Sequence, residues 1–400
     1  YFYMLVNFSF SNFGPFKEKQ VINFEAIKSI KNHKNSLISN NSVGKRFLPV
    51  ICFYGPNGGG KTAILAALST FYKIISNSNN YIFPQERLNL FDEKKPLSFE
   101  LLFVIDDTFY KYSISIKNNR EVINESFSFT KNKLTNKETI LFDKKRDILN
   151  IEEFDIKQVS KINTISTVPI FSFLAGIIKN AHLQNFSKLM SSIVVPDFVK
   201  KIFSNFDYWN KPTKEYMEKN RTKLLKYFND LNFNISNYEF KKTNPIIDSY
   251  EFTSLFLEKE NSNFEKHWLN IALESNGTQK MIAFISNIDK RLEEGGYLFV
   301  DELDASLHTS LLRYIIKLFT SKETNKKGAV LFFNSHDMLT LDNDVFRKDE
   351  IYFSSLNESH IGSISRLSDF NVRDNNSWSK MYSEGKFGAD PYIKYSMEKI

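Results

Sequence analysis

Two short stretches of this chain carry residues whose types and spacing suit phosphate chemistry. The first, GPNGGGKT at residues 55–62, has the GxxxxGKT pattern. Its glycines let backbone N–H groups point at phosphate oxygens, Lys61 would reach the β- and γ-phosphates, and Thr62 would offer a hydroxyl to Mg²⁺. The second stretch, YLFVDE, ends in Asp301 and Glu302. We expect Asp301 to hold Mg²⁺ through water and Glu302 to polarise an attacking water.

A histidine follows the next apolar strand, in the stretch FFNSHD. Placed just beyond a strand end, His336 fits a sensor of the γ-phosphate, although a purely structural histidine is the alternative. The neighbours Ser335 and Asp337 do not make it a hydrolase triad, because residues adjacent on one strand cannot align in that way.

The stretch LESNGTQKM, residues 273–281, offers a second anion-binding element. Ser275 and Gly277 come directly before a helical pattern, so a hydroxyl, a glycine N–H and a helix N-terminus coincide. An ordinary N-capped helix is the alternative. Since the chain already has one phosphate loop, a second anion site suggests a place for the nucleotide of a neighbouring subunit.

The elements that must position these residues follow from hydrophobic patterning. Alternating patterns predict strands in residues 4–13 and 19–27, joined by a turn at Gly14-Pro15, and a hairpin of residues 97–105 and 109–116. Apolar runs predict buried strands at 48–54, 297–300 and 329–333 and in DEIYFSSL. A helical pattern follows the glycine loop. Such strands, separated by helices and ending in polar residues, indicate an α/β fold with a mixed, mostly parallel sheet flanked by helices.

The composition and the hydrophobic patterning of the chain change near residue 118 and again near residue 266. We predict an N-terminal part of a nucleotide-binding head in residues 1–117 and its C-terminal part in residues 266–400. Residues 118–265, with charged and asparagine-rich stretches between apolar helical ones, are predicted to be a mostly helical insertion or arm.

Composition limits the class of protein. The 42% hydrophobic and 25% charged fractions are typical of a globular protein, and the single Cys52 excludes an internal disulfide and fits a reducing cytosol. We see no signal peptide and no apolar run long enough for a membrane helix, so a cytoplasmic location is expected. The net charge of +7 suits a nucleic-acid partner, but it also fits genome bias toward lysine and asparagine.

Taken in order, these motifs resemble the ATP-binding-cassette heads of the SMC, RecF and OLD-like ATPases. GPNGGGKT looks like their Walker A, YLFVDE like their Walker B and ESNGT like a signature motif that departs from LSGGQ. LDASLH resembles the D-loop, with Asp304 at its key position, and His336 resembles the switch histidine. The resemblance covers residues 4–116 and 266–353 and implies a P-loop NTPase fold.

The resemblance also implies ligands and residue roles. ATP and Mg²⁺ are the expected cofactors, with Lys61, Glu302 and His336 as catalytic residues. The residues that the resemblance assigns to nucleotide binding are Asn57, Gly58, Gly60, Lys61, Thr62, Ala63, Ser275, Gly277 and Asp304, and those it assigns to the metal are Thr62 and Asp301. It further implies a head-to-tail homodimer with two ATP molecules between the heads. A Q-loop glutamine is expected as well, for which Gln85 and Gln158 are both open.

The C-terminal stretch narrows the resemblance. SRLSDFNVRDNNSWSKMYSEGKFGADP is similar to the end of bacterial AAA-type proteins that include ATPase subunits of the AbiL, RloA and PARIS phage-defence systems. Asp390 departs from their pattern, where an apolar residue precedes Pro391. The implied function is an ATPase switch in abortive infection that controls a separate effector, such as a Toprim-type nuclease. A RecF- or SMC-like ATPase of DNA repair or chromosome maintenance that grips duplex DNA is the alternative, and a membrane-transport ATPase ranks behind both.

Overall fold

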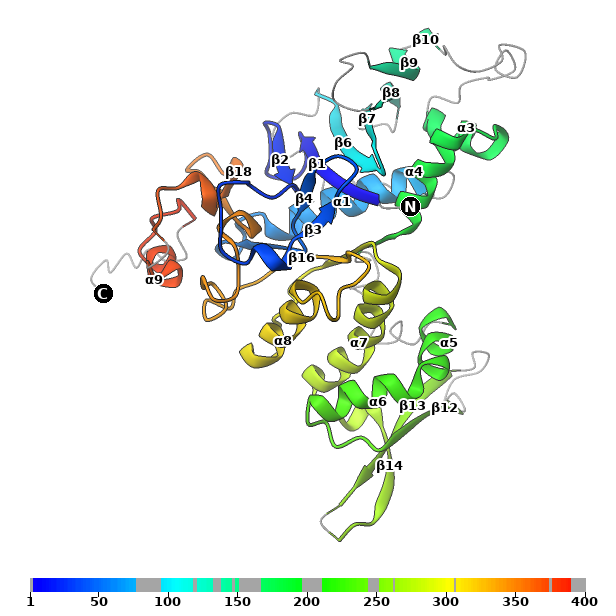
Figure 1. The fold of residues 1–400 in the computed structure, drawn as a ribbon, viewed down its shortest axis with the longest axis vertical. Helices are drawn as coiled ribbons and strands as arrows, with labels where there is room; N and C mark the ends of the chain where they lie inside the picture. Colours follow the sequence, from blue (N-terminus) through cyan, green and yellow to red (C-terminus); the bar gives the residue numbers. More distant parts are fainter. Residues whose placement is uncertain are drawn as a thin grey trace, which may run out of the picture.

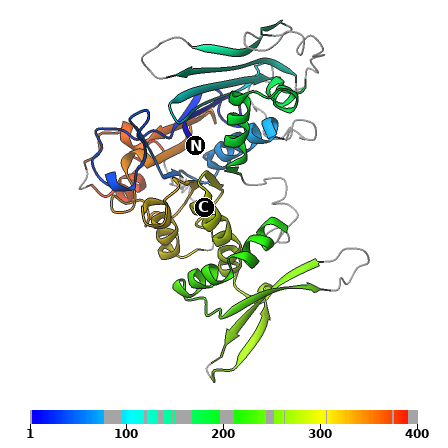
Figure 2. The same cartoon turned by 45° about the vertical axis from the view of Figure 1, so that its right-hand side comes forward.

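The computed structural model describes residues 3–76, 95–117, 121–131, 138–145, 148–150, 167–195, 211–243, 252–261, 263–305, 307–373 and 376–389. Two larger sheets and their helices form the body of the molecule, and a smaller sheet projects from it below helices α6 and α7 (Figure 1). The turned view in Figure 2 shows the same projection.

A six-stranded sheet carries the predicted phosphate chemistry. Its strands lie in the order β11-β15-β16-β5-β17-β18, and all neighbours are parallel except β17 and β18. This arrangement confirms the predicted α/β fold with a mostly parallel sheet. The strands are β5 (Val50–Tyr54), β11 (Ile193–Val194), β15 (Tyr297–Val300), β16 (Val330–Asn334), β17 (Ile351–Leu356) and β18 (Gly362–Arg366).

Both faces of this sheet are buried, as a parallel sheet requires. Successive side chains of a strand point to opposite faces, so Ile51 and Phe53 of β5 enter one core while Cys52 and Tyr54 enter the other. Helix α1 (Lys61–Ser76) packs in the first core. The second core contains α7 (Asn276–Glu294) and α8 (Thr309–Thr320).

A seven-stranded antiparallel sheet covers the other side of α1. Phe71 of α1 packs against Phe8 and Phe99, with ring centroids 5.6 and 5.7 Å apart respectively. The helix therefore lies between two sheets, with α3 (Ile170–Ile177) and α4 (Ala181–Ser191) beside it. The strands, in the order β10-β9-β8-β7-β6-β1-β2, are β1 (Tyr3–Ser11), β2 (Gln20–Asn23), β6 (Leu97–Ile105), β7 (Thr108–Ile116), β8 (Val122–Lys131), β9 (Thr139–Lys145) and β10 (Ile148–Asn150).

The predicted helical insertion is of mixed structure in its described part. Strands β8 to β10 extend the N-terminal sheet, because β8 pairs with β7 along nearly its whole length. The expectation of helices holds for α3 to α6 and is wrong for these strands and for the projecting sheet. The elements of that projection are α5 (Lys211–Lys219), α6 (Arg221–Asp230), β12 (Asn237–Thr243), β13 (Phe252–Glu260) and β14 (Lys266–Asn270).

Helix α7 anchors this projection through one buried acid. The Asp289 carboxylate accepts hydrogen bonds from Tyr216 at 2.8 Å and Tyr227 at 3.2 Å, and it pairs with Lys223 at 2.5 Å. Its side chain has no exposed surface. We call α5, α6 and β12–β14 together the arm. The contacts of Asp289 attach the arm to α7, the helix that begins after Ser275.

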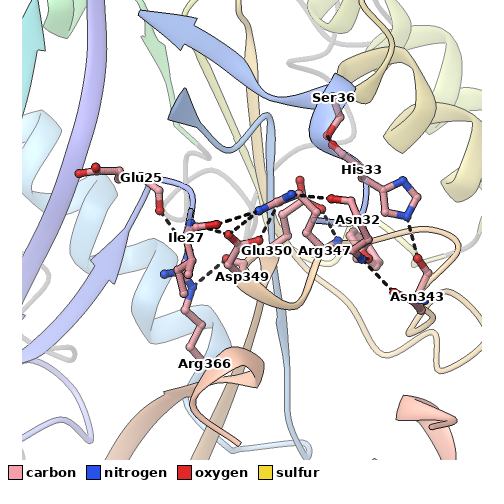
Figure 3. A network of polar contacts seen from close by, with 11 residues as sticks. Glu25, Ile27, Asn32, His33, Ser36, Asn343, Arg347, Asp349, Glu350 and Arg366 are labelled. Carbon is pink, nitrogen blue, oxygen red and sulfur yellow. Dashed lines mark hydrogen bonds and ion pairs between the residues drawn. The ribbon is translucent and has the colours of Figure 1, made fainter. Parts of the chain in front are cut away.

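The first and last parts of the chain are joined by a buried polar network (Figure 3). Arg347 pairs with Asp349 through two bonds of 2.9 Å, and its guanidinium also donates to the carbonyl of Asn32 at 2.5 Å. Asp349 in turn accepts from the backbone N–H of Ile27 at 2.7 Å. The contacts with Asn32 and Ile27 each span more than 300 positions. The remaining elements are β3 (Ile38–Asn40), β4 (Lys45–Phe47), α9 (Trp378–Ser383) and 3₁₀ turns at Lys34–Ser36, Ile271–Leu273, Lys348–Glu350 and Leu367–Asp369.

Candidate nucleotide site

The glycine loop joins the central strand β5 to the first turn of α1. A Cβ at Gly55 would lie 2.2 Å from the carbonyl oxygen of Ser354, and one at Gly60 would lie 2.9 Å from the ring of Phe16. Gly60 also has a φ of +96°, which L side chains rarely adopt. The hydroxyl of Ser354 donates to the Gly59 carbonyl at 2.5 Å. The loop thus packs against β17. Gly55 is required by close backbone approach, and Gly60 by its positive φ and the nearby Phe16 ring.

Lys61 lies at the base of the loop. It is 6% exposed, and its ammonium donates to the carbonyls of Gly55 at 2.7 Å and Pro56 at 2.9 Å. Burial lowers the pKa of Lys61 to about 8, against the opposing pull of nearby carboxylates, of which Asp304 is the strongest. A charged lysine at this place is suited to meet an anion in the loop.

Three polar side chains connect the loop to the strand ends. Thr62 Oγ1 donates to Asp301 Oδ1 at 3.1 Å, and Asn334 Nδ2 donates to the same oxygen at 2.6 Å. The Asn334 Oδ1 atom accepts from the backbone N–H of Glu302. Because β15 and β16 are parallel neighbours, the acids that follow β15 and the amide that ends β16 meet at one edge of the sheet.

Glu302 occupies an unusual backbone position. Its φ is +51°, in the left-handed region that non-glycine residues seldom enter. Lys280 of α7 donates to the Glu302 carbonyl at 2.7 Å and to the Ala305 carbonyl at 3.1 Å. The helix that starts after Ser275 therefore contacts the turn that presents Glu302.

His336 is positioned by Asp304. The backbone N–H of His336 donates to Asp304 Oδ2 at 2.7 Å, whereas Asp304 Oδ1 is buried and makes no hydrogen bond within the described structure. Burial and the charge of Lys61 lower the pKa of His336, so its imidazole is neutral at pH 7.

These elements enclose a cavity of about 420 Å³ at the carboxyl ends of the strands. Eight of the predicted site residues line it: Asn57, Gly58, Gly60, Lys61, Thr62, Ala63, Glu302 and His336. The residues lining it that were not among the predicted site residues are Pro15, Gly59, Asn334, Leu356 and His360. Asp301 joins the site through Thr62 and Asn334, and Asp304 joins it through His336.

Residues 50–342 match the family described as "AAA domain, putative AbiEii toxin, Type IV TA system". The match begins at β5 and ends beyond His336, and it spans more than half of the chain. The chain belongs to this AAA-domain family. No curated protein sequence matches the chain.

Solved structures with similarity to this AAA protein include heads of SMC proteins. An SmcHead bound to the C-winged helix domain of ScpA has 12% identity and a TM-score of 0.44, covering 90% of this chain and 96% of that chain. The SMC head domain from Thermotoga maritima has 14% identity and a TM-score of 0.40, covering 90% and 98%. A Pyrococcus yayanosii Smc head domain with a coiled coil and joint has 10% identity and a TM-score of 0.43, covering 96% and 100%.

The donor set of the AAA domain fits a hard divalent cation. Thr62 and Asp301 bring a hydroxyl and a carboxylate oxygen within 3.1 Å of each other, beside the phosphate loop. Mg²⁺ prefers such oxygen ligands and is commonly held by one or two protein groups together with substrate phosphates. Among the described residues, no group of three or more His, Cys, Asp or Glu gathers in a way that could hold a metal ion on its own.

The second predicted anion element lies apart from the cavity. Ser275 caps α7, since its Oγ accepts from the backbone N–H of Thr278 at 3.2 Å, and its side chain is exposed. Neither Ser275 nor Gly277 is among the described residues that line the cavity. Leu273 nearby is 75% exposed. The N-cap role is confirmed, whereas anion binding by this element stays a prediction.

The remaining expectations concern the Q-loop, the C-terminal stretch and a membrane helix. Gln85 and Gln158, the two candidates for a Q-loop, lie outside the described residues, as do Asp390 and Pro391. Within the described part of the chain, no helix has the length and apolar character needed to span a bilayer.

Proposed function

We propose that this AAA protein binds and hydrolyses ATP with Mg²⁺ and acts as the switch subunit of a bacterial anti-phage, abortive-infection system. Lys61 and the loop amides bind the phosphates, Thr62 and Asp301 hold the metal, and Glu302 orients and polarises the attacking water. The neutral His336 donates or accepts a hydrogen bond at the γ-phosphate end of the cavity.

The observation that carries the proposal is that the two predicted anion-binding elements do not share one cavity. One is the loop at Lys61, which lines the cavity, and the other is the N-terminus of α7 at Ser275 and Gly277, which does not. In a head-to-tail homodimer the second element of each subunit meets the nucleotide held by the other. The exposed Leu273 (75%) and Leu339 (70%), beside Ser275 and His336 in sequence, are then buried between the subunits.

Links between these parts support the proposed control of a separate effector. The arm is tied to α7 through Asp289, and α7 contacts the turn of Glu302 through Lys280. A cue on the arm can therefore change closure or hydrolysis, and closure can change the surface offered to an effector such as a Toprim-type nuclease. The toxin–antitoxin description of the family supports this defence role.

The test is the substitution Glu302→Gln, which keeps the shape of the side chain and removes its charge. We expect ATP turnover to fall by about 10²- to 10³-fold while ATP still binds, and light scattering should show dimers accumulating with Mg²⁺ and ATP. Glu323→Gln, an exposed acid after α8, is the matched control. Unchanged turnover, or a protein that stays monomeric with bound ATP, would contradict the proposal.

A second candidate is a RecF- or SMC-like ATPase that binds duplex DNA in repair or chromosome maintenance. The observation favouring it is the charge of the arm, where residues 211–243 contain eight Lys or Arg and four Asp or Glu. If DNA is bound there, its affinity should fall steeply with salt and rise with ATP. Fluorescence anisotropy with a labelled duplex at several salt concentrations separates this candidate from the first.

A further inference from the structure

The cavity at the phosphate loop is lined by two chemically different sets of residues. The loop and the strand ends contribute backbone N–H groups and ionisable side chains, which suit a triphosphate and its cation. The same cavity is also lined by Pro15, Leu356 and His360, none of which has a place in that chemistry. These three residues offer two apolar surfaces and one imidazole ring.

The ring of His360 is presented by a tightly organised turn between β17 and β18. The side-chain oxygen of Asn357 accepts from the backbone N–H groups of Ser359 at 3.0 Å and Ile361 at 2.9 Å. The N–H of His360 donates to the Asn357 carbonyl at 2.9 Å, and His360 itself has a φ of +58°. Residues with a β-carbon seldom adopt this conformation, and those that do are often found at ligand-binding sites.

Hydrogen bonds connect the strands on either side of this turn to the phosphate loop and to the segment at Pro15. Ser354 of β17 bonds the Gly59 carbonyl at 2.5 Å, and the Gly362 N–H of β18 donates to the Pro15 carbonyl at 2.7 Å. The ring of Phe16 packs against both Gly60 and Gly362. The backbone that carries His360 is therefore held beside the loop, so little ordering of the main chain is needed when a ligand contacts both sets of residues.

We propose that His360, with Leu356 and Pro15, forms the nucleobase subsite of this cavity. The imidazole stacks on the plane of the base, and the two apolar side chains cover its edge and opposite surface. Histidine and aromatic rings bind bases in this way because every base has a π-face. The inference rests on the proposed function, since it assumes that the loop binds the triphosphate of a nucleotide.

The test compares two probes with Mg²⁺ by isothermal titration calorimetry: ATP, which has a base, and inorganic tripolyphosphate, which has none. His360→Asn removes the ring, and asparagine tolerates the positive φ. We expect its ATP affinity to fall by about 5- to 100-fold, as loss of one base stack predicts, while tripolyphosphate affinity changes less than twofold. His360→Phe retains an aromatic plane and should restore most of the ATP affinity.

Control variants distinguish a failure of the base subsite from a failure of nucleotide binding by the loop. His267→Ala, on the exposed arm strand β14, should leave both affinities unchanged. Lys61→Ala should weaken both probes. If His360→Asn leaves the ratio of the two affinities unchanged, or if His360→Phe binds ATP as weakly as His360→Asn, the base subsite is overturned. If Lys61→Ala binds both probes as well as the unmodified protein, or if that protein binds neither, nucleotide binding by the loop is overturned instead.

Discussion

Thr62 Oγ1 and Asp301 Oδ1 lie 3.1 Å apart although 239 positions separate them in the chain. Thr62 is at the start of α1 and Asp301 follows the end of β15, and the sheet order β15-β16-β5 brings them to one edge. Asn334, at the end of the strand between them, contacts the same carboxylate oxygen at 2.6 Å. The pair is thus held in place by strands from widely separated parts of the chain.

Replacing Asp301 should affect catalysis more than folding. For Asp301→Asn we expect a fall in Mg²⁺-dependent ATP turnover of about 10²-fold or more, because the carboxylate charge beside Thr62 is lost while the shape is kept. Turnover is measured across a Mg²⁺ titration. The exposed Asp344→Asn is the matched control, and it also tests whether the DND sequence at residues 342–344 has any part in metal binding. A similar loss in both variants would contradict the assignment.

The affinity for ATP should depend on pH through Lys61. Burial lowers the pKa of Lys61 to about 8 in the structure, so the lysine loses its charge as the pH rises through 8. If the phosphates require the ammonium, the Kd for ATP should rise about tenfold between pH 8 and pH 9.5, with proton uptake on binding over the same range.

Calorimetry in buffers of different ionisation enthalpy measures both quantities. Lys61→Arg serves as the comparison, because arginine stays charged throughout this range. Its binding should be weaker at pH 7, yet nearly independent of pH up to 9.5. An equally steep pH dependence in the arginine variant would show that another group is responsible.

Gly55→Ala should distort the phosphate loop. The added Cβ would lie 2.2 Å from the carbonyl oxygen of Ser354, which is backbone and cannot rotate away. We expect ATP affinity to fall at least tenfold and the free energy of unfolding to fall by about 1–3 kcal/mol. Gly176→Ala, in helix α3 with nothing within 4 Å, should instead raise the unfolding free energy by about 0.5–1 kcal/mol. Urea titration measures the free energy of unfolding and distinguishes the expected decrease in Gly55→Ala from the expected increase in Gly176→Ala.

Ionisation of the buried Glu350 should lower the free energy of unfolding as the pH rises. Burial raises its pKa to about 8, against an ordinary value of 4.5, and its Oε1 atom makes no hydrogen bond in the described structure. Between pH 4.5 and 8 the folded state therefore binds more protons than the unfolded state, and the unfolding free energy falls with pH, by at most about 1.4 kcal/mol per unit.

The substitution Glu350→Gln removes this contribution. Urea titrations at several pH values should show a flatter dependence than in the unmodified protein. Some slope will remain, because burial also raises the pKa of Glu125 to about 7. The exposed Glu358→Gln should leave the slope as it was, and a steeper slope in Glu350→Gln would rule out this account.

Much of the site was predictable because it depends on local patterns. Residues 297–300 were predicted as a buried strand with the bounds that β15 has, and the glycine loop was placed between a strand and a helix. In each case a short apolar run and the polar residues directly after it carry the information.

Contacts between distant segments were not predictable in this way. Asn334 lies in the FFNSHD stretch, yet its role depends on β16 lying between β15 and β5, which no local pattern specifies. The same holds for Glu125 of β8, whose carboxylate accepts from the N–H groups of Ile170 and Phe171 at the start of α3. Strand β8 was missed because its partner β7 lies outside the segment in which it was sought, and β9 and β10 join the sheet only through β8.

The strand order of the central sheet has a consequence for biosynthesis. Strand β5 ends at Tyr54, but both of its hydrogen-bonded neighbours, β16 and β17, lie after residue 329. At about 5–20 residues per second, a ribosome needs tens of seconds to deliver them. Through that interval the strand that leads into the phosphate loop lacks both of its sheet neighbours, so we expect a nascent chain to bind nucleotide only after residues 330–356 have been made.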